Sequence, residues 1–184
     1  DHNSIAWAVD ENGQMWDNTL TNQIHSITWS NNIFTEGLEY SIHPKGQHGM
    51  GLIVGEDAKY ITLWGNLFAN NGGRNPLIQG GTIVEAVNNV TYNWRYEGYQ
   101  LDQNAKVDLI GNYIKKSSYS NSRNIGIECG FNGQIFNSDN FGGSFLYGCT
   151  STVNIFSSSP VASSGQITAV SSSQAFVNVL ANAG

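Results

Sequence analysis

The sequence predicts an all-β fold, a single right-handed parallel β-helix with about 23 residues per coil. A recurring strand-and-turn segment and an unusual composition carry this prediction. Charged residues make up only 12% of the 184-residue chain, hydrophobic residues 40%, and there are 21 glycines but three prolines. Such a composition favours strands and turns, because the residues that build exposed helices are scarce.

The recurring segment has two or three apolar or β-branched residues, a Gly or Asn, a marker Asn, and two further apolar residues. Its copies are Ile27–Phe34, Ile61–Phe68, Val84–Tyr92, Val107–Ile114 and a degenerate Gln134–Asn140. The marker residues Asn32, Asn66, Asn89, Asn112 and Asn140 are 34, 23, 23 and 28 positions apart. A period near 23 is too short for a helix pair or a propeller blade and fits one coil of a β-helix.

A structural role follows for the marker asparagines. Each amide can bond to the Asn of the coils above and below, so no buried amide is left unpaired at the bend. The alternative is that these asparagines only mark exposed turns. We expect one corner to stack Asn32, Asn66, Asn89 and Asn112. The strands before that corner should contain Ile27, Leu63 or Trp64, Val87 and Ile110.

A second strand per coil is indicated where Gly49–Gly55 overlies Arg74–Gly80 at an offset of 25 residues. The long interval of 34 between Asn32 and Asn66 then holds about 11 extra residues, which we place in Glu36–His48. An insertion between coils forms a loop on one face, and solenoids commonly bind their ligands there.

The whole chain, 1–184, is expected to be one β-helix domain and a piece of a longer protein that lacks its first coils. Residues 151–184 read as a Ser-rich meander followed by a C-terminal strand or helical cap. Cys129 and Cys149 are too few for a disulfide scaffold, and free thiols or one bridge are both open. A net charge of −6 argues against a nucleic-acid partner, and no long apolar stretch predicts membrane insertion.

Several segments together resemble the pectate lyase superfamily, polysaccharide lyase family 1. The resemblance is carried mainly by Asn66–Pro76 (NLFANNGGRNP) and Val87–Trp94 (VNNVTYNW). Asp1-His2 resembles the end of the family's Trp-Ile-Asp-His strand. Weaker likenesses are Trp7–Asn12 and His48–Gly51, and Val179–Gly184 fits the C-terminal stretch. The resemblance covers Asp1 to about Asn140.

This resemblance implies β-elimination in pectate or a related polyuronate, with an arginine taking the C5 proton and Ca²⁺ bridging the substrate carboxylate to the protein. Arg74-Asn75-Pro76 matches the first half of the family's Arg-x-Pro-x-x-Arg pattern. Gln79 stands where the second arginine is expected, which removes a contact to a uronate. We therefore predict Arg74 as the catalytic base and Gln79 as a substrate contact; the alternative for Arg74 is a surface arginine before a turn.

A guanidinium can act as a base only transiently, because its pKa exceeds about 12. Neighbouring cations would help it, and the predicted lattice brings Lys45 and Arg95 to adjacent coils. Lys45 is predicted to be catalytic and Arg95 to bind substrate. His43 and His48 flank Lys45 and are predicted to contact substrate too; the four histidines have no zinc-binding spacing.

For calcium, Asp10 and Glu11 lie in the segment that the resemblance points to. Calcium needs several oxygen ligands. Adjacent side chains of a strand face opposite ways, so both can bind one ion only at a bulge or turn. The family takes another carboxylate from a coil that this chain lacks, so the site is expected to be incomplete, and solvated loop acids are the alternative.

The leading functional prediction is a secreted or extracellular calcium-dependent lyase whose partner is an anionic polysaccharide. The alternative is a non-catalytic carbohydrate-binding segment of a virion tailspike or a surface adhesin. A hydrolase of this fold needs two facing carboxyl groups. The sequence shows no matching cluster of aspartates on successive coils.

Overall fold

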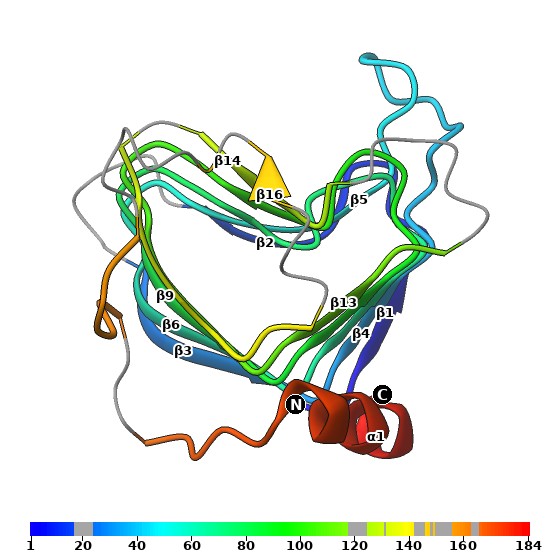
Figure 1. The fold of residues 1–184 in the computed structure, drawn as a ribbon. Helices are drawn as coiled ribbons and strands as arrows, with labels where there is room; N and C mark the ends of the chain where they lie inside the picture. The colour runs from blue at the N-terminus through cyan, green and yellow to red at the C-terminus, as the bar shows by residue number, and fades with distance from the viewer. Residues whose placement is uncertain are drawn as a thin grey trace.

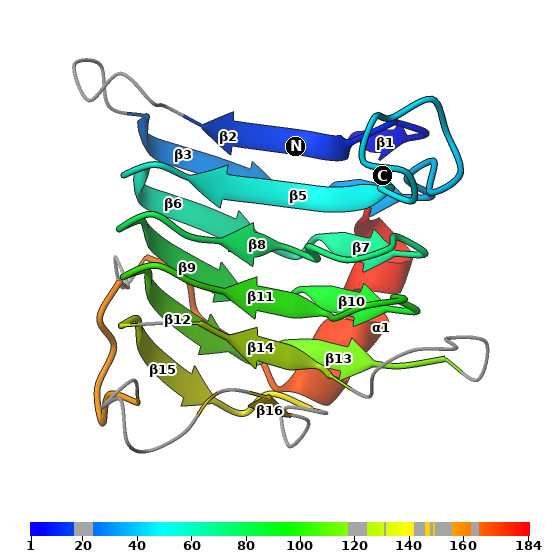
Figure 2. The ribbon, with the colours of Figure 1, turned by 90° about the horizontal axis from the view of Figure 1, so that it is seen from above.

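The computed structural model describes residues 1–16, 24–117, 125–130, 132–141, 146–147, 149, 156–162 and 166–184. Within them the chain forms a right-handed parallel β-helix with one C-terminal helix, which confirms the predicted fold class (Figures 1 and 2). Each complete coil contributes one strand to each of three parallel sheets. The three sheets enclose the core (Figure 1).

The strands fall into sheets A, B and C. Sheet A contains β1 (Ser4–Ala6), β4 (Ile33–Thr35), β7 (Leu67–Ala69), β10 (Val90–Tyr92) and β13 (Tyr113–Lys115). Sheet B contains β2 (Glu11–Trp16), β5 (Met50–Gly55), β8 (Leu77–Ile78), β11 (Tyr99–Leu101), β14 (Ile127–Cys129) and β16 (Leu146–Tyr147). Sheet C contains β3 (His25–Ser30), β6 (Lys59–Trp64), β9 (Ile83–Val87), β12 (Lys106–Ile110) and β15 (Gln134–Ser138).

The predicted asparagine ladder occupies the corner between sheets C and A. Asn66 donates from its backbone N and Nδ2 to Asn89 Oδ1, at 2.9 and 3.0 Å, and Asn89 repeats this pattern on Asn112 at 2.9 and 3.1 Å. The ladder extends to Asn32 above and Asn140 below. The strands before it contain the expected residues, so the prediction is confirmed.

The residue before each marker explains why the sequence repeats Gly or Asn there. Its backbone has positive φ in every coil, with values of 52°, 66°, 53°, 62° and 50° for Asn31, Gly65, Asn88, Gly111 and Asp139. Glycine adopts this left-handed conformation without steric cost, and Asn and Asp tolerate it better than other residues. The sequence pattern therefore encodes the corner.

The predicted overlay in sheet B is wrong by one residue. Ile53 pairs with Leu77, an offset of 24 and not 25, whereas Met50 bridges to Gly73, an offset of 23. The change of offset inserts one residue into the segment around Arg74, whose φ is 55°. Because side chains alternate between faces, such a bulge re-aims the side chain that it contains.

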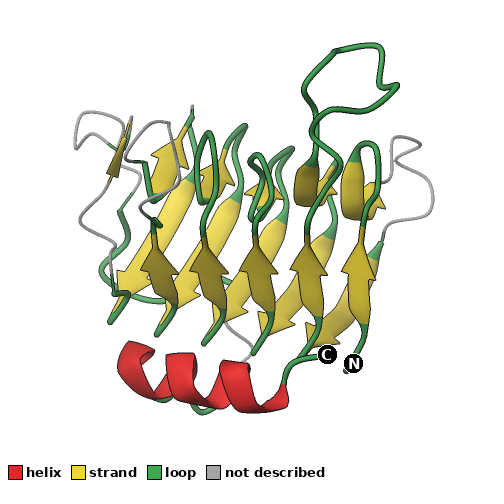
Figure 3. Cartoon of the chain, turned by 90° about the vertical axis from the view of Figure 1, so that its right-hand side faces the viewer, coloured by secondary structure: helices red, strands yellow, loops and turns green. Residues whose placement is uncertain are grey.

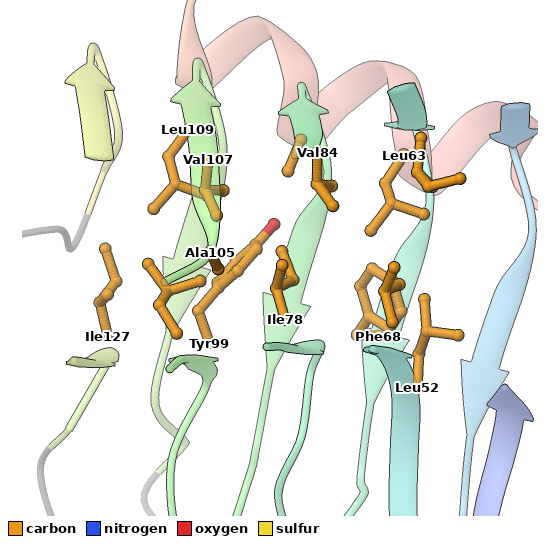
Figure 4. Close-up of a cluster of buried hydrophobic side chains, with 14 of the residues drawn as sticks. Leu52, Leu63, Phe68, Ile78, Val84, Tyr99, Ala105, Val107, Leu109 and Ile127 are labelled. Atoms are coloured by element: carbon orange, nitrogen blue, oxygen red, sulfur yellow. The ribbon is translucent and has the colours of Figure 1, made fainter. Parts of the chain in front are cut away.

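Apolar side chains from all three sheets fill the interior (Figure 4). Leu52, Leu63, Val84, Val107 and Leu109 are fully buried. Phe34 and Phe68 stack with ring centroids 5.1 Å apart on adjacent coils. Removing this apolar surface from water supplies the main driving force for stacking the coils.

Helix α1 (Ser172–Asn182) runs along the corner between sheets C and A (Figure 3). Ser171 caps it by accepting a bond from the Gln174 N–H. For residues 151–184 the sequence predicted a Ser-rich meander followed by a strand or a helical cap, and the structure has a helix at the C-terminal end. Residues 151–155 and 163–165 of this segment lie outside the described residues. Cys129 and Cys149 form a disulfide. No helix in the described part of the chain is long and apolar enough to cross a membrane.

Candidate functional site

Three residues that the sequence singled out, Asp10, His48 and Arg74, lie with Glu97, which it did not, at the edge of sheet B where its strands begin. Asp10 directly precedes β2, His48 lies two residues before β5, Arg74 three before β8 and Glu97 two before β11. The connection from β4 to β5 contains the predicted insertion and projects beside this edge (Figure 3). Parallel stacking therefore brings residues far apart in sequence to one place.

Arg74 forms an ion pair with Glu11 from two coils away. The arginine side chain is 23% exposed and the glutamate 7%. The Arg74 backbone N–H donates to Glu97 Oε1 at 3.0 Å, and Leu52 N–H donates to the Arg74 carbonyl at 2.8 Å. The base predicted from sequence is therefore held from both sides and reaches solvent only in part.

Asp10 faces two histidines of the projecting loop. Its Oδ1 lies 2.9 Å from His48 Nε2 and its Oδ2 lies 3.4 Å from His43 Nε2. The two imidazole rings stack with centroids 4.4 Å apart and an interplanar angle of 15°. The loop that the sequence marked as an insertion is thus anchored to the start of β2.

Burial raises the pKa of the Glu11 carboxyl, and its hydrogen bond with Asp10 adds to the rise, against the opposing charge of Arg74. Burial also acts to raise the pKa of Asp10. There the Glu11 hydrogen bond and the positive charges of His48, His43 and Arg74 outweigh it, so the pKa of Asp10 is lowered. Asp10 is the more acidic member of this adjacent pair.

A second chain of hydrogen-bonded asparagine side chains, not predicted from the sequence, links the segments that carry Glu11, Arg74 and Glu97. Asn12 Nδ2 donates to Asn71 Oδ1 at 3.1 Å, Asn71 Nδ2 to Asn75 Oδ1 at 2.9 Å, and Asn75 Nδ2 to the Glu97 carbonyl at 3.3 Å. Asn12 directly follows Glu11 in sequence, and Asn75 directly follows Arg74. The run Asn70-Asn71-Gly72-Gly73-Arg74-Asn75 was the available signal for it.

The other predicted residues take different places. Arg95 is paired with Glu39 of the loop and lies 3.3 Å from Tyr40 Oη, so the two arginines bind separate carboxylates. Lys45 is exposed on the loop, and its backbone N–H donates to His43 Nδ1 at 3.2 Å. Gln79 follows β8 and lies beside Gly55, at the opposite end of the strand from Arg74. The expected cluster of unpaired cations is therefore not formed by Arg74 and Arg95.

The residues expected to hold calcium do not form an oxygen-rich cage among the described residues. Glu11 is engaged by Arg74, and Asp10 is accompanied by two imidazole nitrogens. Calcium is a hard cation that takes six to eight oxygen ligands. One carboxylate with two nitrogens is a poor match for that requirement.

No protein-family model matches the chain. It is similar to three fungal proteins named as probable pectin lyases. Identity is 32% over 95 residues with pectin lyase D of Emericella nidulans, covering 52% of this chain and 25% of that protein. It is 29% over 118 residues with pectin lyase B of Aspergillus niger, covering 64% and 30%.

With pectin lyase A of Aspergillus niger, identity is 27% over 183 residues, covering 89% of this chain and 46% of that protein. The chain therefore spans between a quarter and about half the length of these relatives. Together with the parallel β-helix, the similarity confirms the resemblance to the pectate lyase superfamily that the sequence indicated.

Proposed function

We propose that this chain, a pectate lyase-like parallel β-helix, is the catalytic part of a polysaccharide lyase that cleaves pectin or its de-esterified form. The observation that carries the proposal is the partly exposed Arg74 at the edge of sheet B, beside a loop that can border a bound sugar chain. The relatives named pectin lyase support the same reaction class.

The reaction is an elimination and consumes no water. A base removes the proton from C5 of a uronate unit, the C4–O bond breaks, and a C4–C5 double bond forms. The departing oxygen keeps the bonding electrons and takes up a proton. Catalysis therefore needs a base above C5 and positive charge that stabilises the electrons delocalised toward the C6 carboxyl group.

Arg74 is the proposed base, and its ion pair with Glu11 would have to break before it acts. A guanidinium beside a carboxylate gives up its proton less readily, because the negative charge stabilises the cation. Substrate must therefore separate Arg74 from Glu11. A neutral C6 ester group that takes the place of Glu11 beside Arg74 would remove this effect and leave an arginine nitrogen free to lie over C5.

Lys45 is the proposed second cation. Its position on the exposed loop lets its flexible side chain follow a substrate carboxyl. Arg95, His43, His48 and Gln79 stay proposed substrate contacts, and in the free chain the first three are turned toward Glu39 or Asp10. Loop movement on binding would release them.

Calcium dependence stays a prediction from the resemblance, and the mixed donor set around Asp10 gives it little support. A neutral methyl ester at C6 lowers the need for a bridging cation, because no carboxylate charge has to be offset. Activity on highly esterified pectin is thus expected in the presence of a chelator. Activity on polygalacturonate is the condition under which calcium should matter.

We also propose that the protein works outside the cell. The Cys129–Cys149 disulfide supports this location, since disulfides persist in oxidising compartments. A polysaccharide of plant walls would be met there.

The proposal is tested by mixing the purified chain with esterified pectin or polygalacturonate, each with calcium or with a chelator. A lyase gives an ultraviolet absorbance rise from the C4–C5 double bond. New reducing ends without that absorbance would indicate a hydrolase. Binding without product would favour the non-catalytic carbohydrate-binding segment.

A further inference from the structure

We infer that Asp10, His43 and His48 bind one divalent transition-metal ion, for which zinc is the natural probe. Their ligand atoms all lie within 4.8 Å of one another, and the three residues come from two separate segments, the start of β2 and the projecting loop. The inference does not rest on the proposed lyase activity, because it concerns metal binding in the absence of polysaccharide.

Two atoms of the cluster are buried without a hydrogen bond. His48 is 6% exposed, and its Nε2 lies 2.9 Å from Asp10 Oδ1, yet neither atom has a hydrogen-bond partner of acceptable geometry among the described residues. A buried polar atom left unpaired destabilises the folded chain. An ion between the nitrogen and the oxygen would satisfy both atoms at once.

The arrangement of the three side chains fits a small cation. Nearly parallel rings place both Nε2 atoms against the two oxygens of one carboxylate. A tetrahedral zinc bound at about 2.0–2.1 Å holds its donors roughly 3.3 Å apart. The separations of 2.9 and 3.4 Å, one to each oxygen of the carboxylate, lie near that value, and all the ligand atoms lie within 4.8 Å of one another, so side-chain shifts could complete the site.

The donor set selects the class of metal. Imidazole nitrogen suits zinc, copper, nickel and iron, whereas calcium and magnesium prefer oxygen alone. Two histidines and one carboxylate also leave coordination positions open for other ligands. The spacing of the histidines along the sequence hid this site, because the third ligand comes from the neighbouring coil.

The surrounding charges permit a cation here. Arg74 and Lys45 oppose it, but Glu11 neutralises Arg74 through their ion pair and Lys45 is solvent-exposed. One local contact must change. His43 Nδ1 accepts from the Lys45 N–H at 3.2 Å, which puts the ring proton of a neutral His43 on Nε2. If His43 binds the metal through Nε2, its ring proton moves to Nδ1. Nδ1 can then no longer accept the hydrogen bond from the Lys45 N–H.

Two structural consequences follow. The metal would tie the loop to the start of β2, so it should stabilise the folded chain by mass action. His48, buried and already in place, should contribute more affinity than His43, which must rearrange. Both effects can be measured without substrate.

The test uses chelator-treated, dialysed protein titrated separately with ZnCl₂ and CaCl₂. Calorimetry and thermal unfolding report binding, and Co²⁺ in place of zinc reports the ligand field by visible absorption. We expect one zinc per chain, a raised Tm with zinc, and no comparable effect of calcium.

The variants are Asp10→Asn and His43→Gln, with the exposed His25→Gln on β3 as matched control. Asp10→Asn keeps the shape of the side chain, and the His43 side chain, 12% exposed, is slightly less buried than that of His48, which is 8% exposed. Zinc affinity should fall at least 10-fold in both and stay unchanged in the control. The inference would be overturned if the parent chain did not bind zinc, or if both variants bound zinc as tightly as the parent. Calcium binding as tight as zinc binding would also overturn it.

Discussion

Arg74 and Glu11 lie two coils apart in the β-helix and form an ion pair at the edge of sheet B. The pair joins the predicted base to a carboxylate that the sequence had assigned to calcium. Glu11 is the partner of Arg74 in the free chain, so the proposed base has to be released from this ion pair before it can act.

Arg74→Lys tests the base directly. Lysine keeps the positive charge but loses the planar fork that places a nitrogen over C5. Turnover on pectin should fall by roughly 100-fold or more, the scale of a positioned general base, with a smaller change in KM. Steady-state kinetics measure both. Arg95→Lys is the matched control and should change turnover by only a few-fold.

Glu11→Gln separates two roles for the carboxylate. Glutamine keeps an acceptor for the guanidinium but removes the negative charge that holds its proton, so Arg74 becomes easier to deprotonate. Turnover should stay within about 10-fold of the parent, since orientation is largely kept. A loss as large as that of Arg74→Lys would instead identify Glu11 as the base.

The asparagine ladder gives a prediction for stability. In Asn89→Ala, the backbone N–H of Asn66 loses its only acceptor in the core, and Asn66 Nδ2 keeps only the Trp29 carbonyl. An unsatisfied buried group costs about 1–3 kcal/mol, so the free energy of unfolding should fall by about that amount. Urea unfolding measures it.

Asn178→Ala on the exposed surface of α1 is the control for this change. Surface substitutions usually stay within about 0.5 kcal/mol. Equal losses in the two variants would show that the ladder adds no specific stability.

Salt should weaken the binding of polygalacturonate despite the net charge of −6. Local positive charge captures an anionic chain, and the exposed Lys45 supplies it. The screening length falls from about 30 Å at 0.01 M salt to about 3 Å at 1 M, so affinity should drop steadily over that range.

Lys45→Ala should flatten this salt dependence, whereas Lys59→Ala on sheet C should not. Lys59 is already paired with Asp57 at 2.8 Å. Calorimetric titrations compare the three proteins. An affinity indifferent to salt, or equal binding of a neutral glucan, would contradict the electrostatic account.

The sequence predicted the fold well because corner residues are visible in it. Marker asparagines such as Asn66 and Asn89 pair along the stack, and each is preceded by a residue suited to positive φ. The marker asparagine and the positive-φ residue before it occur once in every coil, so they can be detected as a repeat in the sequence. The bulge at Arg74 was missed, since a one-residue change of register leaves no periodic signal.

The site was predicted only in part. Residues such as Asp10, His48 and Arg74 do meet at one edge, as stacking requires. Their partners could not be foreseen, because side-chain pairing across two coils depends on the bulge and on the loop conformation. Glu97 and the amide chain beneath Arg74 were overlooked for the same reason.

Mass spectrometry of the products from esterified pectin tests the central claim most directly. Elimination leaves a non-reducing end that is lighter by one water than a hydrolysed end, and no label from H₂¹⁸O enters the product. The account predicts unsaturated oligomers from the parent chain and almost none from Arg74→Lys under the same conditions. Saturated, ¹⁸O-labelled oligomers, or unsaturated products formed equally well by Arg74→Lys, would contradict it.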